Sequence, residues 1–165
     1  MGLVFILALT VRLLYIGEMQ DNPLMSDLVL DSLTNNEAAS YIYEHGQYME
    51  YPFMRAPAYY YFLGGIYKVF GYQNFLAVRI IQAFLGAMSC VFLFLIARRL
   101  FDWKIGIISG ILAALYWMNV FYAADIMYTI PTVFMYALFL WILLNWDTDH
   151  YLKWVVSGII LSLAI

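Results

Sequence analysis

The sequence has few charged residues and a single cysteine. Only 12% of its 165 residues are charged and 65% are hydrophobic, whereas an average soluble domain has about 25% and 45–50%. These values exclude an ordinary water-soluble domain and a disordered chain. Eight Lys and Arg against eleven Asp and Glu provide no basic face for nucleic acid. The lone Cys90 excludes a disulfide framework and a cysteine-based metal site within the chain. The composition therefore indicates an integral membrane protein.

Apolar runs predict an all-α, polytopic membrane protein, because a helix that crosses a bilayer needs about 20 mostly apolar residues. We expect four transmembrane helices and the start of a fifth, with an outer loop over residues 17–74. The expected spans are residues 3–16, 75–97, 105–123, 130–146 and 155–165. A helix that ended inside the bilayer would leave its last carbonyls unsatisfied. We therefore expect residues 1–165 to form the N-terminal part of one larger transmembrane domain.

The basic residues predict the orientation of the chain. Arg98, Arg99 and Lys104 flank a short turn, which the positive-inside rule places in the cytoplasm. The loop over residues 17–74 then lies outside, as does the turn near Tyr128. The charged residues of the loop are seven acids, Glu18, Asp21, Asp27, Asp31, Glu37, Glu44 and Glu50, and two bases, Arg55 and Lys68. We expect a multi-pass protein of the plasma (inner) membrane with an acidic extracytoplasmic loop.

Two short helices are expected in the outer loop. Thr34 and Glu37 fit a capping box, which predicts a helix over residues 35–45 that Gly46 ends. A second helix over residues 58–70 is too short to span and rich in tyrosine. Aromatic rings with a polar tip are typical of the headgroup level, so we expect this helix to lie in the outer interface. The tyrosines that support this are Tyr59, Tyr60 and Tyr61.

Five motifs follow one another along most of the chain. They are Val29-Leu30-Asp31-Ser32, Glu37-Ala38-Ala39, Arg55-Ala56-Pro57-Ala58-Tyr59-Tyr60-Tyr61-Phe62-Leu63, Val78-Arg79-Ile80-Ile81-Gln82-Ala83-Phe84-Leu85-Gly86 and Ala97-Arg98-Arg99-Leu100-Phe101. In this order they resemble the opening of the GT-C superfamily of polyprenyl-phosphate-sugar-dependent glycosyltransferases. The nearest branch looks like the RgtA-like domain, which is related to lipid A aminoarabinose transferases and protein O-mannosyltransferases.

The resemblance implies a reaction on the extracytoplasmic face of the cell envelope. A hydroxyl of an acceptor lipid, glycan or protein attacks the anomeric carbon of a sugar linked to a polyprenyl phosphate. A carboxylate of the outer loop acts as general base, and the lipid phosphate departs. This chemistry needs a carboxylate close to the acceptor and positive charge beside the phosphate. We expect hexosyl or pentosyl transfer by the whole enzyme, and no activity from residues 1–165 alone.

The resemblance assigns roles to four residues of this sequence. Asp31 is the expected catalytic base and Glu37 its helper. Taken without the resemblance, Asp31 is a turn or helix-cap aspartate, and the capping box explains Glu37 equally well. Arg55 and Arg79 are the candidate ligands of the donor phosphate, because a guanidinium binds phosphate oxygens bidentately. Both also suit arginines that meet lipid headgroups.

Asp125 is the acid of the second outer turn and a candidate second carboxylate. Related enzymes have an acid immediately before the proline of this turn, whereas Ile130 precedes Pro131 here, so a structural role for Asp125 is favoured. A cofactor is not identified from the sequence: a divalent metal is one option, with Glu37 as a ligand, but the residues at two other positions do not support it. Asn36 stands where the family often has another Asp, and Arg55 lies near the position of a metal-binding Glu in the aminoarabinose branch.

Two other classes of protein stay open as alternatives. A transporter or channel would need polar residues at mid-membrane and broken helices. A non-catalytic membrane scaffold would use the outer acids only to keep its loop in solvent. The third and fourth spans hold few polar or phenolic residues, which include Ser109, Tyr116, Asn119 and Tyr136.

Overall fold

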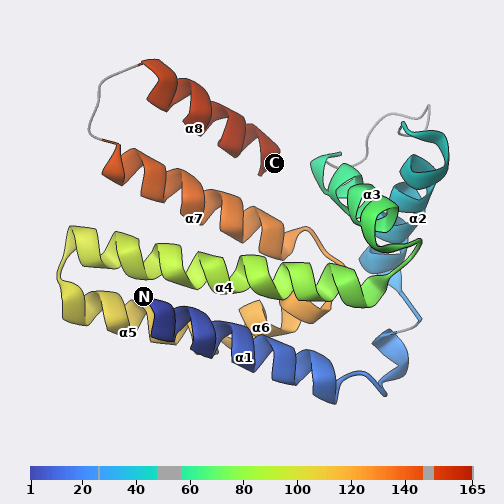
Figure 1. The fold of residues 1–165 in the computed structure, drawn as a ribbon, viewed down its shortest axis with the longest axis horizontal. Coiled ribbons are helices and arrows are strands. Elements are labelled where there is room, and N and C mark those ends of the chain that lie inside the picture. Colours follow the sequence, from blue (N-terminus) through green and yellow to red (C-terminus); the bar gives the residue numbers. More distant parts are fainter. Residues whose placement is uncertain (26, 48–56, 147–150, 165) are drawn as a thin grey trace.

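The computed structural model describes residues 1–25, 27–47, 57–146 and 151–164, and within these ranges the fold is helical with no strand. A long antiparallel bundle occupies most of the molecule, and two further helices lie at one of its ends (Figure 1). The elements are α1 (Gly2–Glu18), η1 (Pro23–Met25), α2 (Leu30–His45), α3 (Ala58–Phe70), α4 (Phe75–Leu100), α5 (Trp103–Leu115), α6 (Trp117–Ala124), α7 (Thr129–Asn145) and α8 (Tyr151–Leu163). The predicted all-α fold class is confirmed.

Helix α4 is the centre of the bundle, because α1, α5, α6 and α7 all pack against it. A glycine permits the close approach of α1. A Cβ added at Gly86 of α4 would lie 2.7 Å from Nε of Arg12. The Arg12 side chain is fully buried, and its Nη1 donates a hydrogen bond of 2.8 Å to the carbonyl of Ala8. Small residues at helix crossings are typical of membrane bundles.

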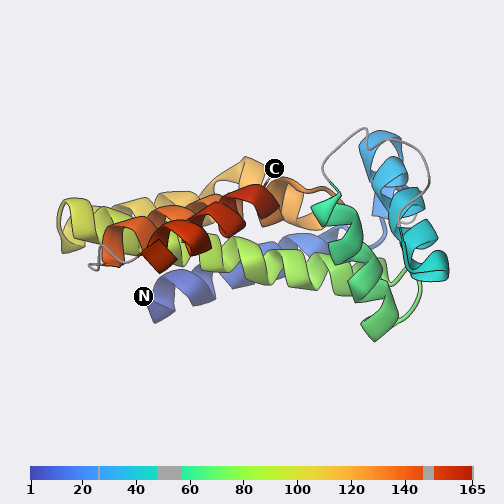
Figure 2. The ribbon, with the colours of Figure 1, turned by 90° about the horizontal axis from the view of Figure 1, so that it is seen from above.

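Helices α2 and α3 pack against each other beyond the end of the bundle where α1 ends and α4 begins (Figures 1 and 2). Their contact buries Ala39 and Ile42 of α2 and Leu63 and Tyr67 of α3. The turn between α6 and α7 lies at the same end, and the turn between α4 and α5 lies at the opposite end (Figure 1). The loop that joins the first two long helices therefore contains folded structure.

Helix α2 begins at Leu30, more than one turn before the predicted start. Thr34 therefore lies inside the helix, and its hydroxyl donates to the carbonyl of Leu30 at 3.3 Å. This bond within the helix replaces a cap, so the predicted capping box of Thr34 and Glu37 is wrong. The predicted end is confirmed, because Gly46 has a φ of 76° in the left-handed region that glycine favours. Helix α3 has the predicted bounds.

Among the described helices, α4 is the one that is long and apolar enough to cross a membrane by itself. The predicted span over residues 105–123 is divided at Tyr116 into α5 and α6, which meet at 47° and make a second candidate only when taken together. Helices α1 and α7 have 17 residues each and α8 has 13. Length and composition thus support one or two crossings, fewer than the four that the apolar runs predict.

Candidate functional site

A cavity of about 250 Å³ lies where the turn between α6 and α7 meets the start of α2. Two carboxylates line it, Asp31 and Asp125, and we name it the acidic pocket. Met19, Met25 and Met127 contribute to its apolar lining. The pocket therefore combines negative charge with apolar surroundings, in which electrostatic interactions are stronger than in water.

Asp31 lies in the first turn of α2, where the helix dipole favours a negative charge. It is half-buried and lies on the helix itself, whereas the sequence placed it before the helix. The preceding residue, Leu30, has a φ of 52°. A left-handed conformation at a residue other than glycine costs about 1–2 kcal/mol, and such strain is concentrated at functional sites. The strained residue directly precedes the proposed base.

Asp125 is joined to the start of α2 by a short hydrogen bond. Its Oδ1 accepts from the hydroxyl of Ser32 at 2.6 Å and from the backbone N–H of Ile126 at 2.9 Å. Ser32 is buried and follows Asp31 in the sequence. The bond therefore brings the two carboxylates, which are far apart in the sequence, to one cavity.

Arg79 lies near the start of α4 and fixes the backbone around the acidic pocket. Its Nε donates to the carbonyl of Ala124 and its Nη2 to the carbonyl of Met25, both at 2.8 Å. The side chain is 7% exposed. Two of its guanidinium nitrogens thus donate hydrogen bonds to backbone carbonyls of this protein. The role of Arg79 as a ligand of the donor phosphate stays a prediction.

Gln82 is a residue of the site that the sequence reasoning missed. It is fully buried on α4, and its Nε2 donates to the backbone carbonyl of Asp125 at 2.6 Å. Its Oε1 accepts from the hydroxyl of Tyr59 at 2.7 Å. Arg79 and Gln82 are three residues apart and therefore share one face of the helix. Two polar residues three positions apart in an apolar run are the sequence signal from which Gln82 could have been identified.

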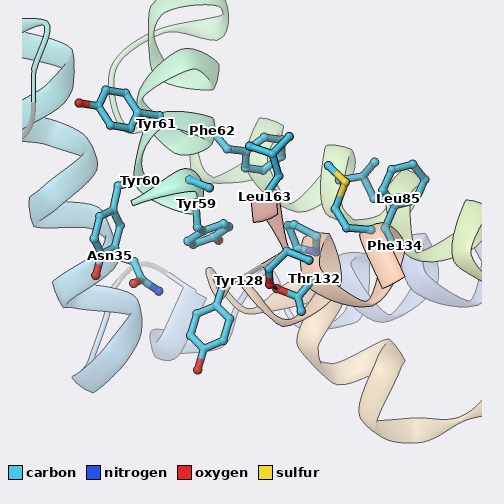
Figure 3. Close-up of a pocket in the computed structure, with 14 residues that line it drawn as sticks. Asn35, Tyr59, Tyr60, Tyr61, Phe62, Leu85, Tyr128, Thr132, Phe134 and Leu163 are labelled. Carbon is cyan, nitrogen blue, oxygen red and sulfur yellow. Dashed lines mark hydrogen bonds between the residues drawn. The ribbon is translucent and has the colours of Figure 1, made fainter. Parts of the chain in front are cut away.

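A second and larger cavity, of about 650 Å³, lies between α3 and the helices α7 and α8. We name it the tyrosine cavity. Figure 3 shows Tyr59, Tyr60 and Tyr61 from α3 on one side and Tyr128 and Thr132 on the other. Tyr59 and Tyr60 are buried, and only Tyr61 is well exposed, at 46%. Of the three tyrosines expected at the interface, two thus pack inside the protein.

The phenol of Tyr59 is held in its protonated form. Burial raises its pKa well above the ordinary value of 10, and the nearby Tyr67 and Asp125 raise it further. Because the ionised form is disfavoured, Tyr59 acts as a stable hydrogen-bond donor to Gln82 at all physiological pH values.

The remaining predicted residues lie elsewhere. Glu37 is exposed on α2 and lines neither cavity. Arg55 lies outside the described residues. Within the described ranges, no three His, Cys, Asp or Glu side chains come together as a metal site would require.

These features define an α-helical protein with an apolar bundle and an acidic pocket at one end of it. Residues 54–165 match the dolichyl-phosphate-mannose-protein mannosyltransferase family, and the chain belongs to this family. The predicted class, a membrane glycosyltransferase of the GT-C type, is thereby confirmed. Comparison with curated proteins and with solved structures gave no match. The matched range includes Arg79, Gln82 and Asp125, and it begins after Asp31 and Glu37.

Proposed function

We propose that the acidic pocket is the catalytic site for transfer of a sugar from a polyprenyl-phosphate donor to a hydroxyl of an acceptor lipid, glycan or protein. The family supplies the general reaction. The observation that carries the proposal is that Asp31 and Asp125 line one cavity at the end of the bundle. Two carboxylates in a small, largely apolar cavity suit a site that binds and deprotonates a hydroxyl group.

Asp31 is the general base in this proposal. It accepts the proton of the acceptor hydroxyl while the oxygen forms a bond to the anomeric carbon. The bond between that carbon and the phosphate oxygen breaks, and the polyprenyl phosphate leaves with its electron pair. Asp31 lies in the first turn of α2, at the end of the helix where the dipole interacts favourably with a carboxylate.

Asp125 orients the acceptor in this proposal. Both hydrogen bonds that its carboxylate accepts from described residues go to Oδ1. We assign to Oδ2 a hydrogen bond from a second donor group of the acceptor, next to the reacting hydroxyl, and this bond holds the reacting hydroxyl beside Asp31. Glu37 as a helper of the base stays a prediction, and its exposed position outside the pocket does not favour it.

The donor phosphate is assigned to Arg55 and Arg79. A departing phosphate needs positive charge beside it. Arg79 already donates two hydrogen bonds to carbonyls near the pocket, so its contribution is chiefly the buried charge. Direct contact of Arg55 with the phosphate oxygens stays a prediction from the sequence.

We further propose that the bundle spans the plasma (inner) membrane with four crossings and the start of a fifth, and that residues 17–74 are extracytoplasmic. A helix of 17 residues is about 25 Å long at 1.5 Å per residue, close to the hydrocarbon core of about 30 Å. Large apolar side chains exposed along the bundle support contact with lipid. They include Ile6 and Leu14 of α1, Ile80 and Phe84 of α4, Ile108 and Leu112 of α5, Leu140 of α7 and Ile159 of α8.

Cysteine labelling in intact cells tests this orientation. Glu44→Cys at the end of α2 should react with a membrane-impermeant maleimide, and Phe101→Cys at the opposite end should react only after permeabilisation. Both positions are exposed, and the native Cys90 is 1% exposed, which keeps the background low. Labelling of position 101, but not of position 44, from outside would contradict the proposed orientation.

A break such as the one between α5 and α6 is also expected in a transporter. In transporters, broken helices point their ends at a binding site inside the membrane domain. Tyr116, at the break, is 58% exposed on the surface of the bundle. The break therefore does not favour the transporter alternative.

The test of the proposed function uses the full-length protein in lipid vesicles. A panel of polyprenyl-phosphate-linked, radiolabelled sugars is supplied together with lipid, glycan and protein fractions from the native membrane. We expect label in one fraction and the release of an equal amount of polyprenyl phosphate. Movement of the intact donor across the vesicle membrane without release of phosphate would indicate a transporter. If folded protein neither transfers the labelled sugar nor moves the donor across the membrane, the result supports a non-catalytic scaffold.

A further inference from the structure

We propose that Gln82 is a positioning residue, which holds the backbone of Asp125 so that its carboxylate faces Asp31 in the acidic pocket. The effect of Gln82 on catalysis rests on the proposed function. Its structural part, the placement of Asp125 beside the start of α2, can be tested without any activity.

The hydrogen bonds of Gln82 fix the orientation of its amide group. Nε2 donates to the carbonyl of Asp125 at 2.6 Å and to the carbonyl of Ala123 at 3.4 Å. Oε1 accepts from Tyr59 at 2.7 Å. A reversed amide would place Oε1 against the carbonyl oxygens of Ala123 and Asp125, which do not donate, so the network defines which atom is which.

Asp125 depends on this support because it follows the last residue of α6 and has an extended backbone, with φ of −89° and ψ of 147°. Helical hydrogen bonds therefore do not hold its carbonyl. Gln82 fixes the backbone of the residue, and Ser32 fixes the carboxylate. The backbone N–H of Met127 also donates to this carbonyl, at 3.0 Å, but that bond lies within the turn itself. Loss of the Gln82 amide therefore removes the bond that ties the Asp125 carbonyl to α4, and residue 125 is held less firmly against that helix.

Two neighbours confine such a shift to the turn. Arg79 still binds the carbonyl of Ala124 when Gln82 is replaced, so the turn stays attached to α4. Tyr59 donates to Oε1 of Gln82, whereas the bond to Asp125 is made by Nε2. Tyr59→Phe should consequently have a smaller effect on Asp125 than replacement of Gln82 itself.

A disulfide between Ser32→Cys and Asp125→Cys reports the position of residue 125 directly, because these two side chains are in hydrogen-bond contact. With Gln82 present, mild oxidation of the full-length protein in membranes should form the disulfide. Gln82→Met should slow its formation several-fold. The matched control is Ser89→Ala, since Ser89 is buried on the same helix but donates only to the carbonyl of Leu85. Equal rates in the Gln82→Met protein and the control would overturn the proposal.

Transfer kinetics with native Ser32 and Asp125 test the consequence for catalysis. Gln82→Met should lower kcat by about tenfold or more, because a misplacement of about 1 Å in the geometry of the site can cost up to about 10²-fold. The KM for the donor should change little. A merely structural role would reduce the amount of folded enzyme and leave kcat per folded molecule unchanged.

The conservative variant Gln82→Glu adds a pH signature. A neutral carboxyl group donates and accepts as the amide does, and burial raises the pKa of a carboxyl group. Relative to the unmodified protein at the same pH, the variant should therefore recover kcat as the pH falls and lose it as the glutamate ionises. Normal kcat in Gln82→Met would overturn the catalytic part of the proposal. Absence of transfer by the unmodified protein would sink the proposed function, and the disulfide result would then decide the positioning alone.

Discussion

Replacement of Asp31 by Asn should reduce sugar transfer by about 10²-fold or more, the usual weight of a general base. The amide has nearly the same shape as the carboxylate but does not accept the proton of the acceptor hydroxyl. The protein should remain folded, because the amide keeps the shape of the side chain and the helix-dipole interaction that is lost contributes about 0.3–1 kcal/mol. Initial rates of transfer by the full-length protein in vesicles measure the effect.

The matched control for this substitution is Asp27→Asn. Asp27 is an exposed carboxylate shortly before α2, and it does not line the acidic pocket. The control should retain the activity of the unmodified protein and thus exclude a general effect of reduced negative charge in the loop. Equal activity of the Asp31→Asn and Asp27→Asn proteins would refute the role of Asp31 as base.

Replacement of Asp125 by Ala should have the second largest effect. It removes the carboxylate that we assign to the acceptor, and transfer should fall by about tenfold or more, as for other groups that orient a reacting atom. It also leaves the Ser32 hydroxyl and the Ile126 N–H without their acceptor. The free energy of unfolding should consequently fall by about 1–3 kcal/mol. Thermal unfolding in detergent and transfer rates measure the two effects separately.

The variant Asp125→Asn separates structure from chemistry at this position. Its side-chain oxygen can still accept from Ser32, so most of the stability should return. Its charge is absent, and we expect transfer to stay low. Full activity of Asp125→Asn would show that Asp125 has only the structural role that the sequence favoured.

Much of the helical fold could be predicted from the sequence, because long apolar runs leave few other structures for the chain. The bounds of α3 and the end of α2 at Gly46 were also correct, since both depend on local signals. The start of α2 and the division at Tyr116 were not predicted. No side chain caps α2, and neither proline nor glycine stands at the break.

The site was less predictable, because it depends on contacts between distant segments. A motif drew attention to Asp31, yet no local pattern indicated that Ser32 would bond to Asp125 across the fold. The spacing of Arg79 and Gln82 suggests a polar face on α4. Only the packing of the outer turn against that face identifies the carbonyls of Ala124 and Asp125 as its partners.

A double-mutant cycle in the full-length protein tests most directly whether the two carboxylates form one catalytic site. Transfer rates are measured for the unmodified protein, for Asp31→Asn, for Asp125→Asn and for the protein with both substitutions. Residues that act on the same bound acceptor molecule have strongly non-additive effects. We therefore predict that the double variant is hardly slower than Asp31→Asn alone. A loss equal to the product of the two single losses would contradict a shared site.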